Sequence, residues 1–332
     1  MKAIVAARHG GPEVLEVRES STPAPGADKV LVRVEAAGVN FIDVYQRSGQ
    51  YATAVPVPLG LEGAGVVEEV GTGVTSATVG ARVAWAGVPG SYATHVLAPA
   101  DKVVPVPDEL GPREAAAAML QGMTAHYLTH DSHALRAGDE CLIHAAAGGV
   151  GLLLCQMAKR AGARVLATVS TEEKAAAARG AGADEVIFYR SQDFVAEVRR
   201  LTQGRGVRVV YDGVGRDTFE KGLDCLALRG SMILFGQSSG AAEPVDPLVL
   251  SAKGSLFLQR PTLFHHVVTR ADLLERAGAV LGWVAEGGLQ LRIAATFPLG
   301  RAADAHRALE GRGTIGKVLL EPGPGDREEG AA

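Results

Sequence analysis

The sequence predicts an α/β protein in which a β-rich region accompanies a doubly wound sheet of six parallel strands. Two observations support this fold class. Residues 1–121 contain short apolar runs separated by turns rich in Gly and Pro, a pattern typical of antiparallel strands. Residues 122–263 contain apolar strand-like runs that alternate with helix-like segments, which is typical of a parallel sheet.

The β-rich region is expected to form an antiparallel, partly barrel-like domain. The C-terminal section, 264–332, is expected to complete this domain, because its apolar run KVLLE (317–321) can return to the first sheet. Before that run, this section contains two helix-like segments, 271–287 and 301–312. The expected strands of residues 1–121 are KAIVAAR (2–8), KVLVRVEAAGV (29–39), GAGVVEEVG (63–71), GARVAWAG (80–87) and YATHVLAP (92–99).

The parallel sheet is expected to occupy a second domain, residues 122–263. Helices are expected at 148–162 and 171–182, the second with Thr171 as its N-terminal cap. The six expected strands are 141–145, 164–169, 185–189, 207–214, 231–236 and 255–259.

Composition excludes several classes of function. A net charge of −4 provides no strong general attraction for nucleic acid or an anionic membrane. No apolar run approaches the length that spans a bilayer. The three cysteines form no C-x-x-C pair, which favours a reducing, cytoplasmic compartment.

The segment AAAGGVG (145–151) indicates a dinucleotide site. It follows a predicted strand and opens a predicted helix, with Ala146, Gly148 and Gly151 at the three glycine positions of a G-x-G-x-x-G fingerprint. The helix N-terminus offers backbone N–H groups to a pyrophosphate. The expected contacts of this turn are Ala147, Gly148, Gly149 and Val150.

The residues after the second predicted strand favour NADPH over NADH. NAD sites usually place an acidic residue there to bind the ribose 2′-hydroxyl group. This chain instead has Ser170, and Lys174 and Tyr189 lie near in the predicted fold. Together they can donate hydrogen bonds to a 2′-phosphate with no opposing carboxylate.

Six segments give the chain a specific family resemblance. The chain resembles the medium-chain dehydrogenase/reductase superfamily, and within it the quinone oxidoreductases related to zeta-crystallin. The resemblance implies that residues 1–121 and 264–332 form a GroES-like catalytic domain and that 122–263 form a Rossmann domain that binds NADPH. The segments that carry it are GVNFIDVYQRSGQY (38–51), PLGLEGAGVVEEVG (58–71), LQGMTAHYL (120–128), HAAAGGVG (144–151), VVYDGVGRDTF (209–219) and GSLFLQRPTL (254–263).

The resemblance also implies that no metal is bound. Zinc alcohol dehydrogenases of this superfamily have Cys at the position of Asn40, His at that of Leu61 and Cys near that of Gln121. Asn, Leu and Gln supply neither thiolate nor imidazole, which Zn²⁺ prefers. A metal-free site favours an acceptor that needs little electrophilic assistance, such as a quinone.

The expected quinone site lies in the segment 38–51. It contains Asn40, the single asparagine of the chain, whose amide can donate to a quinone oxygen or to the nicotinamide end of the cofactor. Tyr45 and Tyr51 can stack on a flat ring, and Asp43 can orient a tyrosine or a water. The resemblance places the quinone and the nicotinamide in a cleft between the domains.

Other family positions carry over as expected cofactor contacts. Met123 and Thr124 are expected beside the nicotinamide and its ribose, and the remaining contacts follow the last two strands of the sheet or lie in the returning C-terminal section. These are Phe235, Gly236, Ser238, Arg260 and Arg312.

Two other functions stay open. The same scaffold can reduce activated C=C bonds of alkenals or enones, with Tyr45 or Tyr51 as the nearby proton donors. The chain can also be a non-catalytic NADPH-binding protein with a structural or RNA-binding role. In each case the apolar edge strand Ser255–Gln259 is expected to pair with a second copy of the chain, giving a homodimer.

Overall fold

The protein was analysed as a computed structural model, which describes residues 1–323 and 326. The chain divides into two compact units. Unit 1 comprises Met1–Met123 and Val267–Ala332, and unit 2 comprises Thr124–His266. The expected boundaries, after residues 121 and 263, lie close to these divisions.

Unit 1 is built on two sheets in its described residues. The larger has seven strands in the order β15-β16-β3-β5-β6-β8, with β7 also paired to β3, and the smaller has the order β2-β1-β4. The strands are β1 (Lys2–Ala6), β2 (Leu15–Glu19), β3 (Lys29–Val39), β4 (Val57–Pro58), β5 (Glu62–Val70), β6 (Arg82–Ala86), β7 (His95–Pro99), β8 (Val103–Pro105), β15 (Ile293–Pro298) and β16 (Lys317–Glu321).

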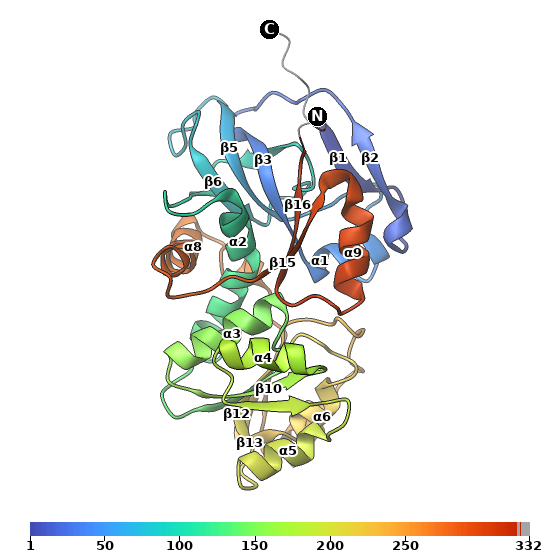
Figure 1. Ribbon diagram of the computed structural model, residues 1–332, viewed down its shortest axis with the longest axis vertical. Coiled ribbons are helices and arrows are strands. Elements are labelled where there is room, and N and C mark those ends of the chain that lie inside the picture. Colours follow the sequence, from blue (N-terminus) through green and yellow to red (C-terminus); the bar gives the residue numbers. More distant parts are fainter. Residues whose placement is uncertain (324–325, 327–332) are drawn as a thin grey trace. The chain divides into compact units, whose positions relative to one another are not determined.

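The C-terminal run KVLLE returns to the sheet of unit 1, as the sequence predicts. It forms β16, which pairs antiparallel with β3 so that Leu319 lies opposite Gly38 and Leu320 opposite Ala37 (Figure 1). Alternating side chains of β3, such as Val32 and Val34, are fully buried in the core of this unit. The first residue of β16, Lys317, is buried as well, which an apolar core permits only if the ammonium group is paired.

The helices of unit 1 include two that the sequence pattern did not predict. The first is α1 (Phe41–Ser48), which begins after Asn40 and contains Asp43 and Tyr45 of the expected quinone site. The second is α2 (Pro112–Tyr127), which begins in unit 1 and ends in unit 2. The two expected C-terminal helices are present as α8 (Arg270–Ala285) and α9 (Ala302–Glu310).

Unit 2 contains the predicted sheet of six parallel strands, in the order β11-β10-β9-β12-β13-β14. The order reverses between β9 and β12, and ligands of such sheets bind at the carboxyl ends of the strands near the reversal. The strands are β9 (Glu140–Ile143), β10 (Arg164–Val169), β11 (Glu185–Phe188), β12 (Val207–Asp212), β13 (Leu226–Leu234) and β14 (Phe257–Gln259).

The helices of unit 2 cover both faces of this sheet. Figure 1 shows α3 and α4 on one face and α5 and α6 on the other. Their arrangement confirms the doubly wound fold class. The helices are α3 (Gly149–Arg160), α4 (Glu172–Gly180), α5 (Phe194–Leu201), α6 (Phe219–Leu223) and α7 (Pro247–Ala252).

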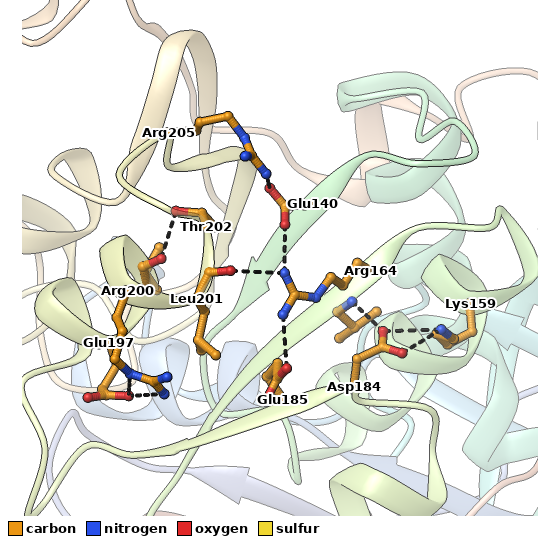
Figure 2. A network of polar contacts seen from close by, with 12 residues as sticks. Glu140, Lys159, Arg164, Asp184, Glu185, Glu197, Arg200, Leu201, Thr202 and Arg205 are labelled. Carbon is orange, nitrogen blue, oxygen red and sulfur yellow. Dashed lines mark hydrogen bonds and ion pairs between the residues drawn. The ribbon is translucent and has the colours of Figure 1, made fainter.

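A charged network joins the amino ends of three neighbouring strands of unit 2 (Figure 2). Arg164, the first residue of β10, donates to Glu140 of β9 at 2.8 Å and to Glu185 of β11 at 2.9 Å. Each of these three side chains is partly exposed, so each pair contributes at most about 1 kcal/mol. The network aligns the strands at the edge opposite their carboxyl ends.

No helix in residues 1–323 is long and apolar enough to cross a membrane.

Candidate functional site

Asn40 occupies the junction between β3 and α1. Its backbone N–H donates to Asp43 Oδ2 at 2.8 Å, so the Asp43 carboxyl group caps the start of the helix. The side chain of Asn40 is turned into unit 1, and the residue is 4% exposed. The lone asparagine of the chain therefore lies at a buried helix start.

The amide of Asn40 has protein partners on both of its polar atoms. Its oxygen accepts from Lys317 Nζ at 2.8 Å and from Gln121 Nε2 at 3.1 Å. Its nitrogen donates to Glu62 Oε2 at 2.8 Å and more weakly to the Gly38 carbonyl at 3.4 Å. A quinone oxygen that bound this amide would have to replace one of these bonds.

Lys317 and Glu62 form an ion pair in the interior of unit 1. The side chain of Lys317 is 3% exposed and that of Glu62 is 0% exposed, and the ammonium group contacts Glu62 Oε2. The other carboxylate oxygen, Oε1, accepts from the Leu120 N–H at 2.5 Å. Gly38 lies against the pair, and a Cβ atom at that position would lie 2.7 Å from Lys317 Nζ. The pair therefore requires glycine at position 38.

A second polar chain extends from Asp43 to the surface of unit 1. Tyr92 donates its hydroxyl hydrogen to Asp43 Oδ2 at 2.7 Å, and its oxygen lies 3.4 Å from His306 Nε2. His306 Nδ1 lies 3.0 Å from Arg47 Nη1. Arg47 also binds both carboxylate oxygens of Glu310, at 2.9 and 2.8 Å. One network thus joins the helices α1 and α9 to the loop residue Tyr92.

Burial shifts the pKa values of the titrating groups in this hydrogen-bonded network. Burial raises the pKa of Asp43 from 3.8 to about 7, although the bonds from Tyr92 and the Asn40 N–H oppose the change. Burial also lowers the pKa of His306 to about 3, and the neighbouring Arg47 charge acts in the same direction. The imidazole is therefore neutral at physiological pH. For Tyr92, burial and the adjacent Asp43 hold the phenol pKa well above its ordinary value.

Tyr45 and Tyr51 form an aromatic pair next to this network. Their ring centroids are 5.1 Å apart with an interplanar angle of 56°, and the Tyr51 N–H donates to the Tyr45 carbonyl at 3.0 Å. Phe41 extends the group, with its ring centroid 6.0 Å from that of Tyr45. All three aromatic residues lie within or just after α1.

In unit 2, the glycine turn has the features of a pyrophosphate site. Gly148 precedes α3, and Gly149, Val150 and Gly151 form its first turn, whose N–H groups have no acceptor within the helix. A Cβ atom on Gly151 would lie 2.7 Å from Ala146 Cα, so only glycine allows the helix to pack this closely. At Gly148 the nearest atom to such a Cβ is the Ala145 carbonyl oxygen at 3.2 Å.

Ser170 and Tyr189 lie at adjacent positions on the carboxyl edge of the same sheet. They follow Val169 and Phe188, the last paired residues of β10 and β11, and the Tyr189 N–H donates to the Val169 carbonyl at 3.2 Å. Lys174 lies in the first turn of α4, where its N–H donates to the cap Thr171 at 3.3 Å, which confirms the expected cap. The three expected 2′-phosphate contacts therefore come from one edge.

Asp212, a buried carboxylate that the sequence pattern did not indicate, fixes the loop that follows β12 at the carboxyl edge of the sheet. Asp212 ends β12, and its Oδ1 accepts from the N–H groups of Val214 and Gly215 at 2.7 and 3.0 Å. Its backbone carbonyl accepts from Phe235 at 2.9 Å and from Gly236 at 3.3 Å. Ser238 is tied to Gly213 by a bond of 3.2 Å.

The expected site residues fall into two sets. Asn40, Asp43, Tyr45 and Tyr51 cluster around α1 of unit 1, which also contains Met123 and Arg312. The other expected cofactor contacts belong to unit 2. Their roles stay predictions. The polar partners that the sequence did not indicate are Arg47, Glu62, Tyr92, Asp212, His306 and Lys317.

Comparisons with known proteins agree with the two-unit architecture. A family model described as alcohol dehydrogenase GroES-like domain matches residues 26–108, and one described as zinc-binding dehydrogenase matches residues 149–280. Quinone oxidoreductase of Pseudomonas aeruginosa is 46% identical over 324 residues, covering 97% of this chain and 99% of that protein. A 2-haloacrylate reductase from a Burkholderia species is 44% identical over 328 residues, covering 96% and 98%.

A solved structure gives the same result. The structure of Escherichia coli quinone oxidoreductase complexed with NADPH matches with a TM-score of 0.95 and 42% identity, covering 97% of this chain and 100% of that one. A GroES-like unit and a Rossmann unit in one chain define a medium-chain dehydrogenase/reductase. Within that superfamily, the chain belongs to the quinone oxidoreductase family.

The expected absence of a metal stays a prediction. Among the described residues, no group of three or more His, Cys, Asp or Glu side chains is arranged to hold a metal ion.

Replacing Asp43 should change how the stability of the protein depends on pH. Because the folded carboxyl group has a pKa of about 7 rather than 3.8, its contribution to stability is complete below pH 3.8 and is lost as the pH rises through 7. The Asp43→Asn variant has no titrating group at position 43, so it does not lose this stability as the pH rises. Its free energy of unfolding should therefore rise relative to wild type by up to about 4 kcal/mol between pH 4 and pH 8, measured by urea denaturation.

Asp184→Asn is the matched control with the opposite sign. Burial raises the pKa of Asp184, but bonds from Lys159 and the Val165 N–H outweigh it and hold that pKa below its ordinary value. This variant should become less stable relative to wild type only as the pH rises towards 3.8, and it should show little further change between about pH 5 and pH 8. A difference between Asp43→Asn and wild type that does not vary with pH would contradict a protonated Asp43.

Proposed function

We propose that the chain is a zinc-independent NADPH:quinone oxidoreductase, in which unit 1 holds the quinone and unit 2 holds NADPH. The observation that carries this proposal is the bonding of Asn40, which stands where zinc dehydrogenases of the superfamily have a cysteine ligand. The Asn40 oxygen accepts from the Lys317 ammonium group at 2.8 Å. This oxygen is already bound by an ammonium group, and an amide supplies neither the thiolate nor the imidazole that Zn²⁺ prefers.

The other two ligand positions support the same reading. Leu61 is a hydrocarbon side chain, and Gln121 uses its amide nitrogen to donate to Asn40 at 3.1 Å. Neither residue supplies the thiolate or imidazole of a zinc site. A chain with this donor set suits an acceptor that accepts a hydride without a Lewis acid, as an electrophilic quinone does.

In unit 1, Tyr45 and Tyr51 are the proposed contacts of the quinone ring. Their inclined rings offer an aromatic surface and two phenolic hydroxyl groups that can donate to quinone oxygens. Asn40 and Asp43 hold the start of the helix that contains Tyr45. Both residues thus act on the ring through the position of α1, and Asn40 is also a proposed contact of the nicotinamide end.

In unit 2, the cofactor is proposed to bind at the carboxyl edge of the sheet, where it would supply the hydride. The first N–H groups of α3 suit the pyrophosphate because they lack helical acceptors and add the positive end of the helix dipole. Glu172, one of the two acids in the first turn of α4, is already paired with Arg179 at 2.9 Å. The proposed contacts are Thr124, Ala147, Gly148, Gly149, Val150, Ser170, Lys174, Tyr189, Phe235, Gly236, Ser238 and Arg260, with Met123 and Arg312 from unit 1.

Reduction of an activated C=C bond is a second candidate. The similarity to a 2-haloacrylate reductase, 44% identical over nearly the whole chain, favours it. Such a reaction adds a hydride to one carbon and a proton to the next, and the hydroxyl groups of Tyr45 and Tyr51 are the proposed proton donors. The two functions share both half-sites and differ in the acceptor.

A steady-state assay of chelator-treated protein tests the proposed function. NADPH and NADH are each offered with 1,2- and 1,4-quinones, an alkenal and 2-chloroacrylate. We expect rapid quinone reduction that survives the chelator, with NADPH preferred because Lys174 and its neighbours can bind the 2′-phosphate. Lys174→Met should raise the KM for NADPH roughly 10-fold, which corresponds to about 1.4 kcal/mol, and leave that for NADH unchanged.

The outcomes separate the candidates. Reduction of 2-chloroacrylate or the alkenal without the quinones would favour the C=C reductase. Activity that disappears with the chelator and returns with Zn²⁺ would contradict the metal-free site. Binding of NADPH without reduction of any acceptor would favour a non-catalytic role.

We also propose that the protein is a cytoplasmic homodimer, joined through the edge strand β14. Its three cysteines are all unpaired and buried, as is common in a reducing compartment. β14 lies at the end of the parallel sheet, and the exposed fractions of Phe257 and Leu258 on it are 54% and 36%. Leu228 of β13, beside Gly254, is 76% exposed. An unpaired apolar edge of this kind favours pairing with a second copy.

Phe257→Lys should disrupt this dimer, because it places two like charges close to a two-fold axis. Sedimentation velocity should show a dimer for wild type and a monomer for the variant. Val79→Lys in unit 1, where the valine is 63% exposed, is the control and should remain dimeric. A monomeric wild type at micromolar concentration would contradict the proposal.

A further inference from the structure

A series of hydrogen bonds links Arg47 to Asp43 through His306 and Tyr92, and its donors can be assigned in only one way. A guanidinium group has donors and no acceptor, so Arg47 Nη1, at 3.0 Å from His306 Nδ1, must donate to it. His306 Nδ1 is therefore the unprotonated nitrogen of a neutral imidazole. The proton of this ring must be on Nε2, and the neighbouring charge of Arg47 fixes the tautomer.

The tautomer of His306 determines the role of Tyr92. The Nε2–H group lies 3.4 Å from the Tyr92 oxygen and can only donate to it. The phenolic hydrogen is then directed to Asp43 Oδ2, at 2.7 Å. The rings of Tyr92 and His306 meet edge to face, with centroids 5.9 Å apart. Each donor in the chain thus points towards the Asp43 carboxyl group.

No positively charged side chain in the described part of unit 1 forms an ion pair with Asp43. Lys317 is paired with Glu62, and Arg47 binds Glu310 through two bonds. These four groups and the Tyr92–His306 pair are the titratable and charged groups around Asp43. The carboxyl group is therefore held by neutral donors, the Tyr92 hydroxyl and the Asn40 N–H.

Both neutral donors bind the same oxygen of Asp43. They reach Oδ2, while Oδ1 is buried without a hydrogen-bond partner among the described residues. A proton on Oδ1 would leave both bonds to Oδ2 intact. The geometry thus suits a neutral carboxylic acid, and the two surrounding ion pairs already balance their own charges.

The chain also links the two turns of the helix that contains Tyr45. Asp43 lies in the first turn of α1 and Arg47 in the last, and Tyr45 lies between them. The link passes through Tyr92 and through His306 of α9, which is 0% exposed. Movement of either turn of α1 would break a bond in this chain.

We propose that His306 and Arg47 are positioning residues for the reaction: through Tyr92 they fix the Asp43 carboxyl group, and with it the helix that presents Tyr45 to the acceptor. The proposal rests on the proposed function in assigning Tyr45 to the acceptor. The tautomer of His306 and the bond from Tyr92 to Asp43 can be tested without any activity.

The first experiment measures the proton positions directly. Long-range ¹H–¹⁵N spectra of the full-length protein report which ring nitrogen of His306 carries hydrogen, with His306→Gln used to assign the signals. We expect an Nε2–H tautomer throughout pH 5–8. An Nδ1–H tautomer, or an imidazolium at neutral pH, would contradict the proposed direction of these hydrogen bonds. This result would hold whichever acceptor the enzyme reduces.

The second experiment separates the two bonds of His306. A glutamine at 306 places an N–H donor near the position of Nε2, and an asparagine places an acceptor near that of Nδ1. ¹³C spectra of aspartate-labelled protein follow the Asp43 carboxyl group, assigned with Asp43→Asn. Tyr92→Phe and His306→Asn should raise the pH at which Asp43 titrates by about one unit, whereas His306→Gln should stay close to wild type.

The kinetic result expected of a positioning role is selective. Tyr92→Phe and His306→Asn should raise the quinone KM or lower kcat roughly 10-fold, because Tyr45 is displaced, with the KM for NADPH unchanged. Tyr211→Phe, at a buried tyrosine of unit 2, is the matched control and should alter neither value.

Two outcomes would overturn the positioning role. One is an unchanged Asp43 titration in Tyr92→Phe, and the other is an equal effect of Gln and Asn at position 306. If wild type reduced no acceptor, the proposed function would fail. The spectra would still show whether His306 and Tyr92 donate hydrogen bonds in the direction of Asp43.

Discussion

The buried ion pair between Lys317 and Glu62 is the contact on which the proposed quinone half-site depends. Removing two such groups from water costs several kcal/mol for each ion, and this cost is offset only if every remaining polar atom has a partner. Glu62 meets the condition through Leu120, Asn40 and Lys317. The pair therefore fixes the positions of β5, β16, the start of α1 and part of α2 at once.

This constraint explains why the C-terminal section belongs to the same unit as the N-terminal strands. Lys317 is the first residue of β16, and antiparallel pairing with β3 places Leu319 opposite Gly38. Gly38 leaves the space that the ion pair occupies. Asn40, two residues further, then reaches both charges with one amide. The amide has two different ends, so it can accept from the ammonium group and donate to the carboxylate, which the apolar residues around it cannot.

The sequence predicts the parts of this structure that repeat a local pattern. The parallel strands, the glycine turn and the return of KVLLE follow from apolar periodicity and from the position of glycine, and the structure contains each of them. Asn40 is conspicuous as the single asparagine of the chain. Helix α1 was not predicted, because its eight residues follow a long strand and begin at a cap that only the folded partners reveal.

The partners of the site could not be predicted for a related reason. Glu62 and Lys317 are separated by most of the chain, and each lies next to apolar residues with no local charge pattern to join them. His306 resembles any polar residue of an amphipathic helix. Its neutral state follows only from burial beside Arg47. The sequence gives no signal for the burial of Lys317, because Lys29 begins the apolar strand β3 in the same way and is exposed.

A double-mutant cycle on the ion pair tests the central dependence most directly. The free energy of unfolding of unit 1 is measured for wild type, Lys317→Met, Glu62→Gln and the double variant. Lys317→Met leaves a buried carboxylate unpaired and should cost about 3–5 kcal/mol, and the double variant should recover a large part of that loss. Additive effects, or a loss below about 1 kcal/mol for Lys317→Met, would contradict the dependence of the site on this pair.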